Sequence, residues 1–193
     1  MALTQQQVLE TLNDIAAPGT TTGLVEAGAI RNLEDALPRL RAAASMKLGF
    51  IHPAEGSAEV AARVAEAPTD LVVLTHASNV SGAILPVAEI AAAVAPVPVL
   101  VDAAQTAGGL AIDFSRLGAA ALVSSGHKGL LGPPGIGVLL MSPGFDIEPL
   151  VQGGTGSRSE SEDMPEHLPD RLEAGTPNGV GAAGLGAACR WLR

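Results

Sequence analysis

The sequence predicts an α/β domain built around a mostly parallel sheet with helices covering both of its faces. Three apolar runs, at 71–74, 97–101 and 119–123, have the length of buried strands. Segments with helical spacing separate them, and this alternation is typical of parallel sheets. Each run ends in polar residues, which are expected to meet because the carboxyl ends of parallel strands share one edge.

The first elements of the domain are predicted from apolar spacing and from the residues at their ends. Residues 57–67 carry Val60 and Val64 on one face of a helix. Residues 86–94 form the next helix, which begins with a proline, a residue tolerated at a first helical position. Ser115 is predicted to cap a short helix ahead of the third apolar run.

The last third of the chain predicts a strand, a loop and a helix. The apolar run 137–141 follows a loop rich in glycine and proline and predicts a further strand. Residues 153–169 are polar and charged, which favours a long surface loop. Residues 180–192 then predict a final helix.

The amino-terminal part of the chain has a different pattern. Thr4 and Gln7 form a capping box at the start of a helix that ends at Pro18. We therefore divide the chain into an atypical amino-terminal helical segment, residues 1–47, and the α/β domain, residues 48–193.

Composition excludes several classes of protein. The 193 residues include 20 acidic and 11 basic side chains, a formal charge of −9, which argues against a nucleic-acid surface. No apolar run approaches the length of a membrane helix, and no signal-like amino terminus is present, so we expect a cytoplasmic protein with no membrane partner. Cys189 is the only cysteine, which excludes an intramolecular disulfide, and no metal site is predicted.

Lys128 is the residue on which the functional interpretation depends. It is one of two lysines in the sequence and follows the apolar run 119–123, at the mouth of a predicted buried strand. A lysine shielded from water there loses its proton more easily, and its free amine can attack a carbonyl. A solvated lysine in a surface turn is the structural alternative, and the commoner one for lysine in general.

The polar residues at the other strand ends complete a set with one chemistry. Asp102 and Gln105 follow the second run, and Asn79 follows the first. An acid, amide side chains and a lysine at one sheet edge are what pyridoxal 5'-phosphate (PLP) requires. For Asp102 the structural alternative is a strand-end residue that caps a turn.

Four segments resemble the class V aminotransferase family, and within it the cysteine desulfurase and selenocysteine lyase branch. They read T-H-A-S-N-V-S-G, V-D-A-A-Q-T-A-G, S-S-G-H-K-G-L-L-G-P-P-G-I-G-V-L and L-E-A-G-T-P-N, in the family's order within residues 70–193. The resemblance implies a partial PLP-binding large domain of the PLP-dependent transferase type, incomplete at both ends. It also implies a small amino-acid substrate, a homodimer and a sulfur-acceptor protein as partner.

The resemblance assigns a role to each candidate residue. Lys128 would form a Schiff base with PLP and move the α-proton of the substrate, while Asp102 would keep the pyridine nitrogen protonated. The other assignments are Gln105 to the phenolic oxygen, Asn79 to the same region or the substrate, Ala104 to a ring face, Ser125 and His127 to the phosphate, and Thr176 to a phosphate across a dimer interface. His76 and His167 are interpreted as structural or surface residues.

The departures from the family leave two functions open. Residues 1–69 lack the family's upstream phosphate turn and ring-stacking histidine, and Cys189 does not match its persulfide cysteine, which belongs to a small domain absent from this sequence. Residues 1–34 faintly resemble the MIP18-type domain of iron–sulfur assembly proteins. The chain is thus interpreted as a PLP-dependent enzyme of the cysteine desulfurase type. The alternative is a truncated or catalytically silent member that acts in iron–sulfur assembly or as an interaction protein.

Overall fold

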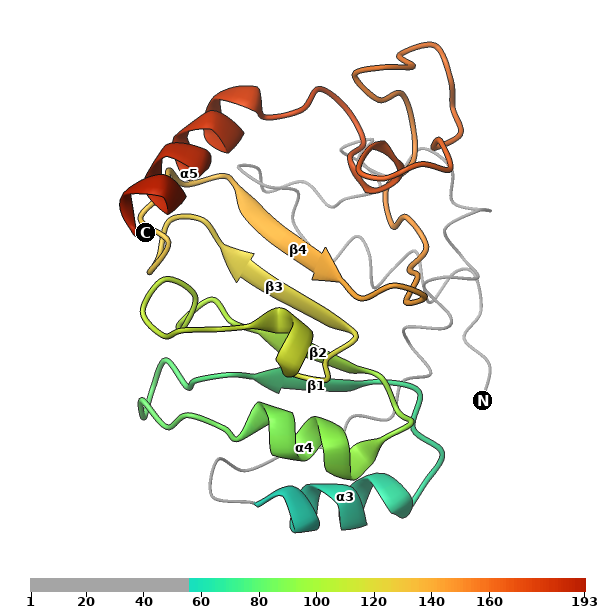
Figure 1. The fold of residues 1–193 in the computed structure, drawn as a ribbon. Coiled ribbons are helices and arrows are strands. Elements are labelled where there is room, and N and C mark those ends of the chain that lie inside the picture. Colours follow the sequence, from blue (N-terminus) through green and yellow to red (C-terminus); the bar gives the residue numbers. More distant parts are fainter. Residues whose placement is uncertain (1–55) are drawn as a thin grey trace, which may run out of the picture. The chain divides into compact units, whose positions relative to one another are not determined.

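The computed structural model describes residues 56–193, which lie within one compact unit (Figure 1). The predicted amino-terminal helix and the boundary between residues 47 and 48 lie outside this range. The elements in chain order are α3 (Ser57–Ala65), β1 (Val72–Thr75), α4 (Val87–Val94), β2 (Val99–Asp102), η1 (Phe114–Arg116), β3 (Ala121–Ser125), β4 (Gly137–Met141), η2 (Asp170–Leu172) and α5 (Gly179–Trp191).

The four strands form one sheet in the order β1-β2-β3-β4. β1, β2 and β3 are parallel, with Thr75 beside Asp102 and Asp102 beside Val123. β4 runs antiparallel to β3 because a loop, with no crossover helix, joins the two strands. The predicted mostly parallel α/β sheet is confirmed.

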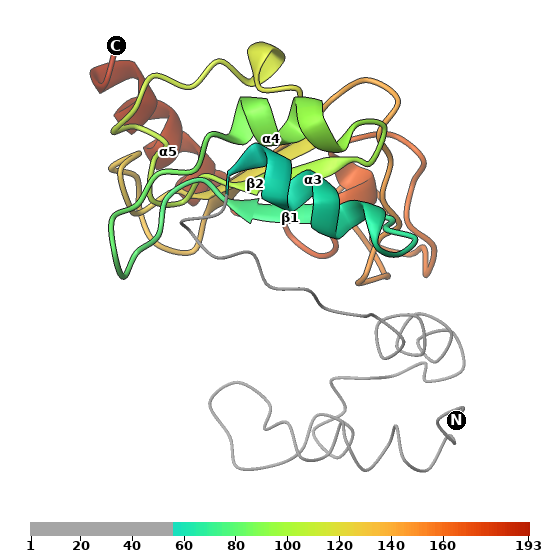
Figure 2. The same cartoon turned by 90° about the horizontal axis from the view of Figure 1, so that it is seen from below.

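The core lies between one face of the sheet and the helices α3 and α4. Alternate residues of β1 are buried and exposed, as expected when a single face of a strand is covered. The largest fully buried side chains come from both helices and from β1 and β2: Val60, Leu74, Ile90, Val99 and Val101. Both helices lie along the same side of the sheet (Figure 2).

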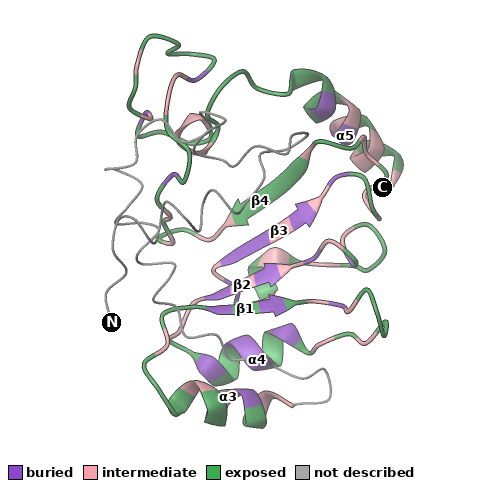
Figure 3. Cartoon of the chain, turned by 180° about the vertical axis from the view of Figure 1, so that it is seen from behind, coloured by how far each residue is buried: buried purple, intermediate pink, exposed green. Residues whose placement is uncertain are grey.

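The other face of the sheet is more exposed within the described residues. Val73 on β1 is 59% exposed and Leu139 on β4 is 37% exposed, so no described helix buries them. β4 is exposed along almost its whole length (Figure 3). We predicted helices on both faces of the sheet. Among residues 56–193, the helices α3 and α4 both pack on one face, and the prediction is confirmed for that face.

Two element ends differ from the predictions. The residue that caps η1 is Asp113. Its Oδ1 accepts hydrogen bonds from the backbone N–H of Ser115 at 3.1 Å and from the Ser115 hydroxyl at 2.6 Å. The prediction that Ser115 is the cap is wrong, because a carboxylate two residues upstream accepts both hydrogen bonds. Pro86 precedes α4 as its N-cap instead of occupying the first helical position.

The remaining elements follow their predictions closely. Residues 153–169 contain no helix or strand, in agreement with the predicted surface loop.

Among the helices from residue 56 onward, none is long and apolar enough to cross a lipid bilayer.

Candidate functional site

All candidate residues except Thr176 lie at the ends of the three parallel strands or on the loops that follow them. Asn79 follows β1, Asp102 ends β2, and Ser125 ends β3. The parallel pairing places these three strand ends at one edge of the sheet. The fold thus confirms that the three predicted strands end at one edge of the sheet.

The loops after β1 and β2 are joined by two hydrogen bonds at His76. The backbone N–H of His76 donates to the carbonyl oxygen of Asp102 at 2.8 Å. Its ring nitrogen Nδ1 lies 2.9 Å from Oγ1 of Thr106, a residue that is only 2% exposed. Burial lowers the pKa of His76 by disfavouring the charged imidazolium.

The loops after β2 and β3 pack backbone against backbone. Ala103 N–H donates to the carbonyl oxygen of Val123 at 2.8 Å. A Cβ added to Gly108 would collide with the carbonyl oxygen of Gly129, so only glycine permits this approach. The loop that carries Lys128 is thereby held beside the turn that follows Asp102.

The Lys128 loop is closed by backbone hydrogen bonds. Gly126 N–H donates to the Ile136 carbonyl and Gly132 N–H to the Gly126 carbonyl, both at 2.8 Å, and Leu131 N–H donates to the Lys128 carbonyl at 2.9 Å. Leu131 has φ of 57°, a left-handed conformation that costs a residue with a Cβ about 1–2 kcal/mol. These bonds hold that conformation, and such strain is characteristic of functional loops.

Lys128 itself is exposed to solvent. The expectation of a lysine shielded from water is wrong for the described residues, because the loop lies at an open edge of the sheet. The buried strand that was predicted ahead of it is present, with Ala121 and Leu122 of β3 both buried.

Asp102 and Ser125 lie on the sheet face opposite to α3 and α4. Val123 pairs with Asp102 and lies two residues before Ser125, so the three share a face. Asp102 is partly buried, and its Oδ1 accepts from the backbone N–H of Ala104 at 2.8 Å. It therefore caps a turn, as the structural alternative predicted, while its Oδ2 makes no hydrogen bond to any described residue.

Ser125 has a buried hydroxyl with no hydrogen-bond partner among residues 56–193. An unpaired buried hydroxyl is costly, by about 1–3 kcal/mol, unless a ligand or solvent pairs with it. At the end of β3, beside the Lys128 loop, it is available to an acceptor such as a phosphate oxygen.

The other candidate residues differ in how far they are buried. Ala104 is partly buried, whereas the more polar members of the set are exposed: Asn79, Gln105, His127 and Thr176. Thr176 lies in the loop before α5, which Asn178 ties to the Gly135 carbonyl through its Nδ2 at 3.0 Å. The described contacts do not join Thr176 to any other candidate residue.

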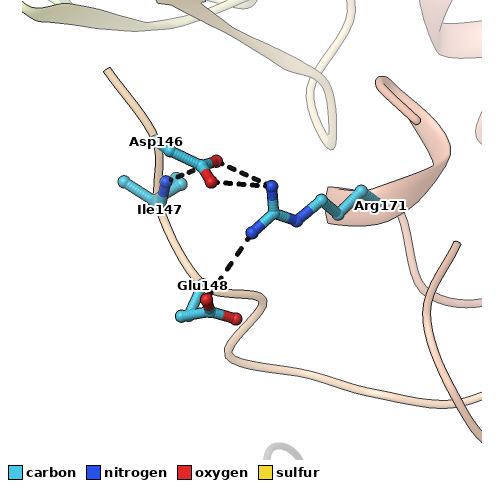
Figure 4. A network of polar contacts seen from close by, with 4 residues as sticks. All are labelled: Asp146, Ile147, Glu148 and Arg171. Carbon is cyan, nitrogen blue, oxygen red and sulfur yellow. Dashed lines mark hydrogen bonds and ion pairs between the residues drawn. The ribbon is translucent and has the colours of Figure 1, made fainter. Parts of the chain in front are cut away.

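An ion-pair network joins the segment after β4 to η2 (Figure 4). Arg171 binds both carboxylate oxygens of Asp146, at 2.8 and 2.9 Å, and lies 3.7 Å from Glu148. The guanidinium hydrogen bonds are the main cause of the lowered pKa of Asp146. A surface cavity of about 470 Å³ beside Arg171 is lined mainly by polar residues and contains none of the candidate residues.

The sequence assigned no functional role to His76 and Thr106, the two residues whose side chains join the loops after β1 and β2. From the sequence, His76 was interpreted as structural, and Thr106 was quoted only within a motif. A signal was present: each lies shortly after an apolar run, at 71–74 or 97–101, as the candidate residues do. Between residues 56 and 193, no group of three or more His, Cys, Asp or Glu side chains is arranged to hold a metal ion.

Comparison with known proteins gives a consistent result. A family model described as aminotransferase class-V matches residues 40–193. A probable cysteine desulfurase of Pyrococcus abyssi is 39% identical over 170 residues, which are 80% of this chain and 40% of that protein. A probable cysteine desulfurase of Methanothermobacter thermautotrophicus is 41% identical over 130 residues, which are 64% of this chain and 32% of that protein.

A solved structure is also similar. The apo structure of a cysteine desulfurase from Thermococcus onnurineus NA1 matches with a TM-score of 0.62 and 34% sequence identity, covering 82% of this chain and 42% of that chain. The chain thus spans less than half the length of these relatives.

Proposed function

The chain belongs to the class V aminotransferase family, and from that premise we propose that it binds PLP through Lys128 and acts on a small amino acid such as cysteine. Enzymes of this family and cysteine desulfurases depend on PLP. The observation that carries the proposal is the packing of the Lys128 loop against the turn after Asp102, through Gly108 and Gly129.

The residues at this edge fit the cofactor chemically. The unpaired buried hydroxyl of Ser125 suits a phosphate oxygen, with the imidazole of His127 two residues away as a second donor. The Oδ2 of Asp102, which has no hydrogen-bond partner among residues 56–193, suits a protonated ring nitrogen, since a carboxylate stabilises a nearby cation. Gln105 and Asn79 would supply amide donors for the phenolic oxygen or the substrate, and the methyl group of Ala104 would pack against the ring.

PLP supplies, when bound, a carbonyl for an amine and a conjugated ring that takes up an electron pair from the substrate α-carbon. The protein residues hold and move protons around it. Lys128 Nζ would hold the cofactor at its carbonyl carbon, with loss of water. Once the substrate amine has displaced it there, the free Nζ would act as the general base that removes the α-proton of the substrate. Asp102 Oδ2 would keep the proton on the ring nitrogen, while Ser125 and His127 would hold the phosphate.

A second copy of the chain is part of the proposal. Lys128 is exposed, so the described loops do not shield it from water. In the proposed homodimer, Thr176 of one copy reaches the phosphate held by the other. We place the protein in the cytoplasm, with a sulfur-acceptor protein as its partner.

The exposure of Lys128 also favours a second candidate function. Water at an open site weakens its electrostatic interactions with a bound group, and a family member without turnover needs no closed site. In that case the chain acts in iron–sulfur assembly or as an interaction protein. Uptake of PLP separates the two functions.

The test is borohydride fixation of PLP on the 193-residue protein, followed by peptide mass spectrometry. We expect a visible absorption band on addition of PLP and, after reduction, a pyridoxyl group on Lys128. Lys128→Ala should abolish attachment, whereas Lys47→Ala should retain it. Fixation that persists in Lys128→Ala, or no fixation in the wild-type chain, would contradict the proposed function.

A further inference from the structure

We infer that His76 and Thr106 are positioning residues of the candidate site. Their side-chain hydrogen bond holds the turn 102–105 in place relative to the loop that carries Asn79. The inference rests on the proposed function, because that turn contains the groups assigned to the ring of PLP. Neither residue is proposed to touch the cofactor or the substrate.

The contact between the two residues is short and shielded. His76 Nδ1 lies 2.9 Å from Thr106 Oγ1, across a sequence separation of 30 residues. Thr106 is 2% exposed and His76 is partly buried. Because water has little access to Thr106, its hydroxyl depends on protein partners.

The Thr106 hydroxyl has two partners for its one proton. Its oxygen lies 3.3 Å from the carbonyl oxygen of Ala103 and 2.9 Å from His76 Nδ1. When the hydroxyl donates to Ala103, its oxygen accepts from a protonated Nδ1. When it donates to Nδ1, the imidazole is neutral with its proton on Nε2. The link between the two loops persists in either arrangement.

Backbone hydrogen bonds connect Thr106 both to the turn after Asp102 and to the segment around Gly108. On one side, the N–H groups of Thr106 and Ala107 donate to the Ala103 carbonyl at 2.9 and 2.8 Å, which closes the turn after Asp102. On the other side, the Thr106 carbonyl accepts from Gly109 and Leu110 at 3.0 and 2.8 Å. These two bonds bracket Gly108, the residue that abuts the Lys128 loop.

Thr106 thus lies between the groups assigned to the ring and the contact that places Lys128. Loss of its hydroxyl should loosen the turn 102–105 and the Gly108 contact together. His76 is bound at both its backbone N–H, to Asp102, and its carbonyl, which accepts from Leu85 at 2.9 Å, so it anchors the link on the β1 side.

The test compares Thr106→Val with Thr106→Ser in the full chain. Valine keeps the shape of threonine without the hydroxyl, whereas serine keeps the hydroxyl. Hydrogen exchange without PLP should show about tenfold faster exchange of the Ala104 and Thr106 amides in Thr106→Val, and near-wild-type exchange in Thr106→Ser. The amides of α3 and α4 should be unchanged in both variants.

The second measurement is the affinity for PLP. Thr106→Val should raise the dissociation constant about tenfold and shift the absorption of bound PLP, while Thr106→Ser should stay within about threefold of the wild type. A residue that only stabilises the fold would leave the absorption unchanged. The same two quantities test the other end of the link. His76→Asn, which has an amide near the position of Nδ1, should bind PLP with the affinity and absorption of the wild type. His76→Leu should show the weaker binding and shifted absorption expected of Thr106→Val.

The outcomes separate the two proposals. Unchanged exchange of the Ala104 and Thr106 amides in Thr106→Val and His76→Leu overturns the inference, whether or not PLP binds. If Thr106→Val does not fold, His76→Leu and His76→Asn decide on the same readouts. A wild-type chain that takes up no PLP, while Thr106→Val still loosens the turn, overturns the proposed function and leaves the positioning of the turn supported.

Discussion

Single residues at the candidate site fall into two groups with different freedom. Asp102 and Ser125 are the last residues of sheet strands, so the backbone ladder holds them and the chain partly buries them. Gln105, His127 and Lys128 lie on loops and are exposed. Exposed side chains lose rotamer freedom when they bind, which costs up to about 2 kcal/mol for lysine. A ligand that binds at this edge therefore has to order the exposed side chains on the loops, whereas Asp102 and Ser125 are already held by the sheet.

His76 predicts a pH dependence of stability. Burial lowers its pKa in the folded chain, so the unfolded chain takes up the proton more readily. Its contribution to stability is present above the unfolded pKa, near 6.5, and is lost as the pH falls through the lowered folded pKa. Urea unfolding between pH 8 and pH 5 should thus show the stability of the wild type declining more steeply with falling pH than that of His76→Asn.

The variant His76→Asn isolates the proton, because asparagine keeps a hydrogen-bonding group but does not titrate. Equal slopes for the wild type and His76→Asn would show that His76 does not contribute to acid sensitivity. Titration of the His76 ring by NMR gives the folded pKa directly and should place it below that of a free histidine.

At the scale of elements, close packing of loops brings the candidate residues together. The strands place three loops at one edge, but spacing between strands leaves the loops free to diverge. The contact of Gly108 with Gly129 and the bond of Thr106 to His76 remove that freedom. The site therefore depends on interactions between loops as much as on the sheet.

Gly108→Ala tests the loop contact against a matched control. Gly108 has φ of +87° and meets the Gly129 backbone, whereas Gly144 has φ of +86° and nothing within 4 Å of an added Cβ. Both substitutions strain a left-handed backbone, but only Gly108→Ala also forces two loops apart. Denaturant unfolding should show Gly108→Ala less stable than Gly144→Ala by about 1–3 kcal/mol. Equal losses in the two variants would show that the loops separate without cost.

At the scale of the whole molecule, apolar side chains remain exposed on the sheet. β4 exposes Val138, Leu139 and Leu140, and β1 exposes Val73 on the face away from α3 and α4. Leu139 and Val73 share that face but lie on the two edge strands of the sheet, and single exposed apolar side chains are common on protein surfaces. The chain also spans less than half the length of its relatives, so its catalytic capacity has to be measured on this chain.

We predict that the 193-residue chain releases little sulfide from cysteine, even with PLP bound. Desulfuration needs a thiolate placed at the substrate sulfur, and the only thiol in the sequence is Cys189, half-buried on α5. Without that alignment, proximity and orientation are lost, which can be worth about 7 kcal/mol or more of the barrier. Exchange of the substrate α-proton should persist, since it needs only Lys128, Asp102 and the cofactor.

The measurement is sulfide release from cysteine with a reductant, in parallel with solvent exchange of the α-proton. Cys189→Ser is the matched variant and should leave both rates as they are. Robust sulfide release that disappears in Cys189→Ser would refute the prediction and make Cys189 the sulfur carrier.

Local sequence determined the elements and the chemistry of the site edge. The runs at 71–74, 97–101 and 119–123 predicted the three parallel strands because burial of a strand is encoded in consecutive apolar residues. Polar residues after each run predicted which edge carries the candidate residues, because parallel strands share their direction. The cap of η1 was assigned to the wrong residue, since Asp113 and Ser115 are both good caps and only geometry selects between them.

Tertiary structure alone decided how the loops meet and which face of the sheet is covered. The bond between His76 and Thr106 and the contact of Gly108 with Gly129 join residues 21 to 30 positions apart, and no local pattern encodes such pairs. The exposure of Lys128 likewise depends on what packs over its loop, which apolar periodicity does not specify. Composition and spacing set the propensity of each segment, but solvent access and contact depend on the three-dimensional neighbours of a residue.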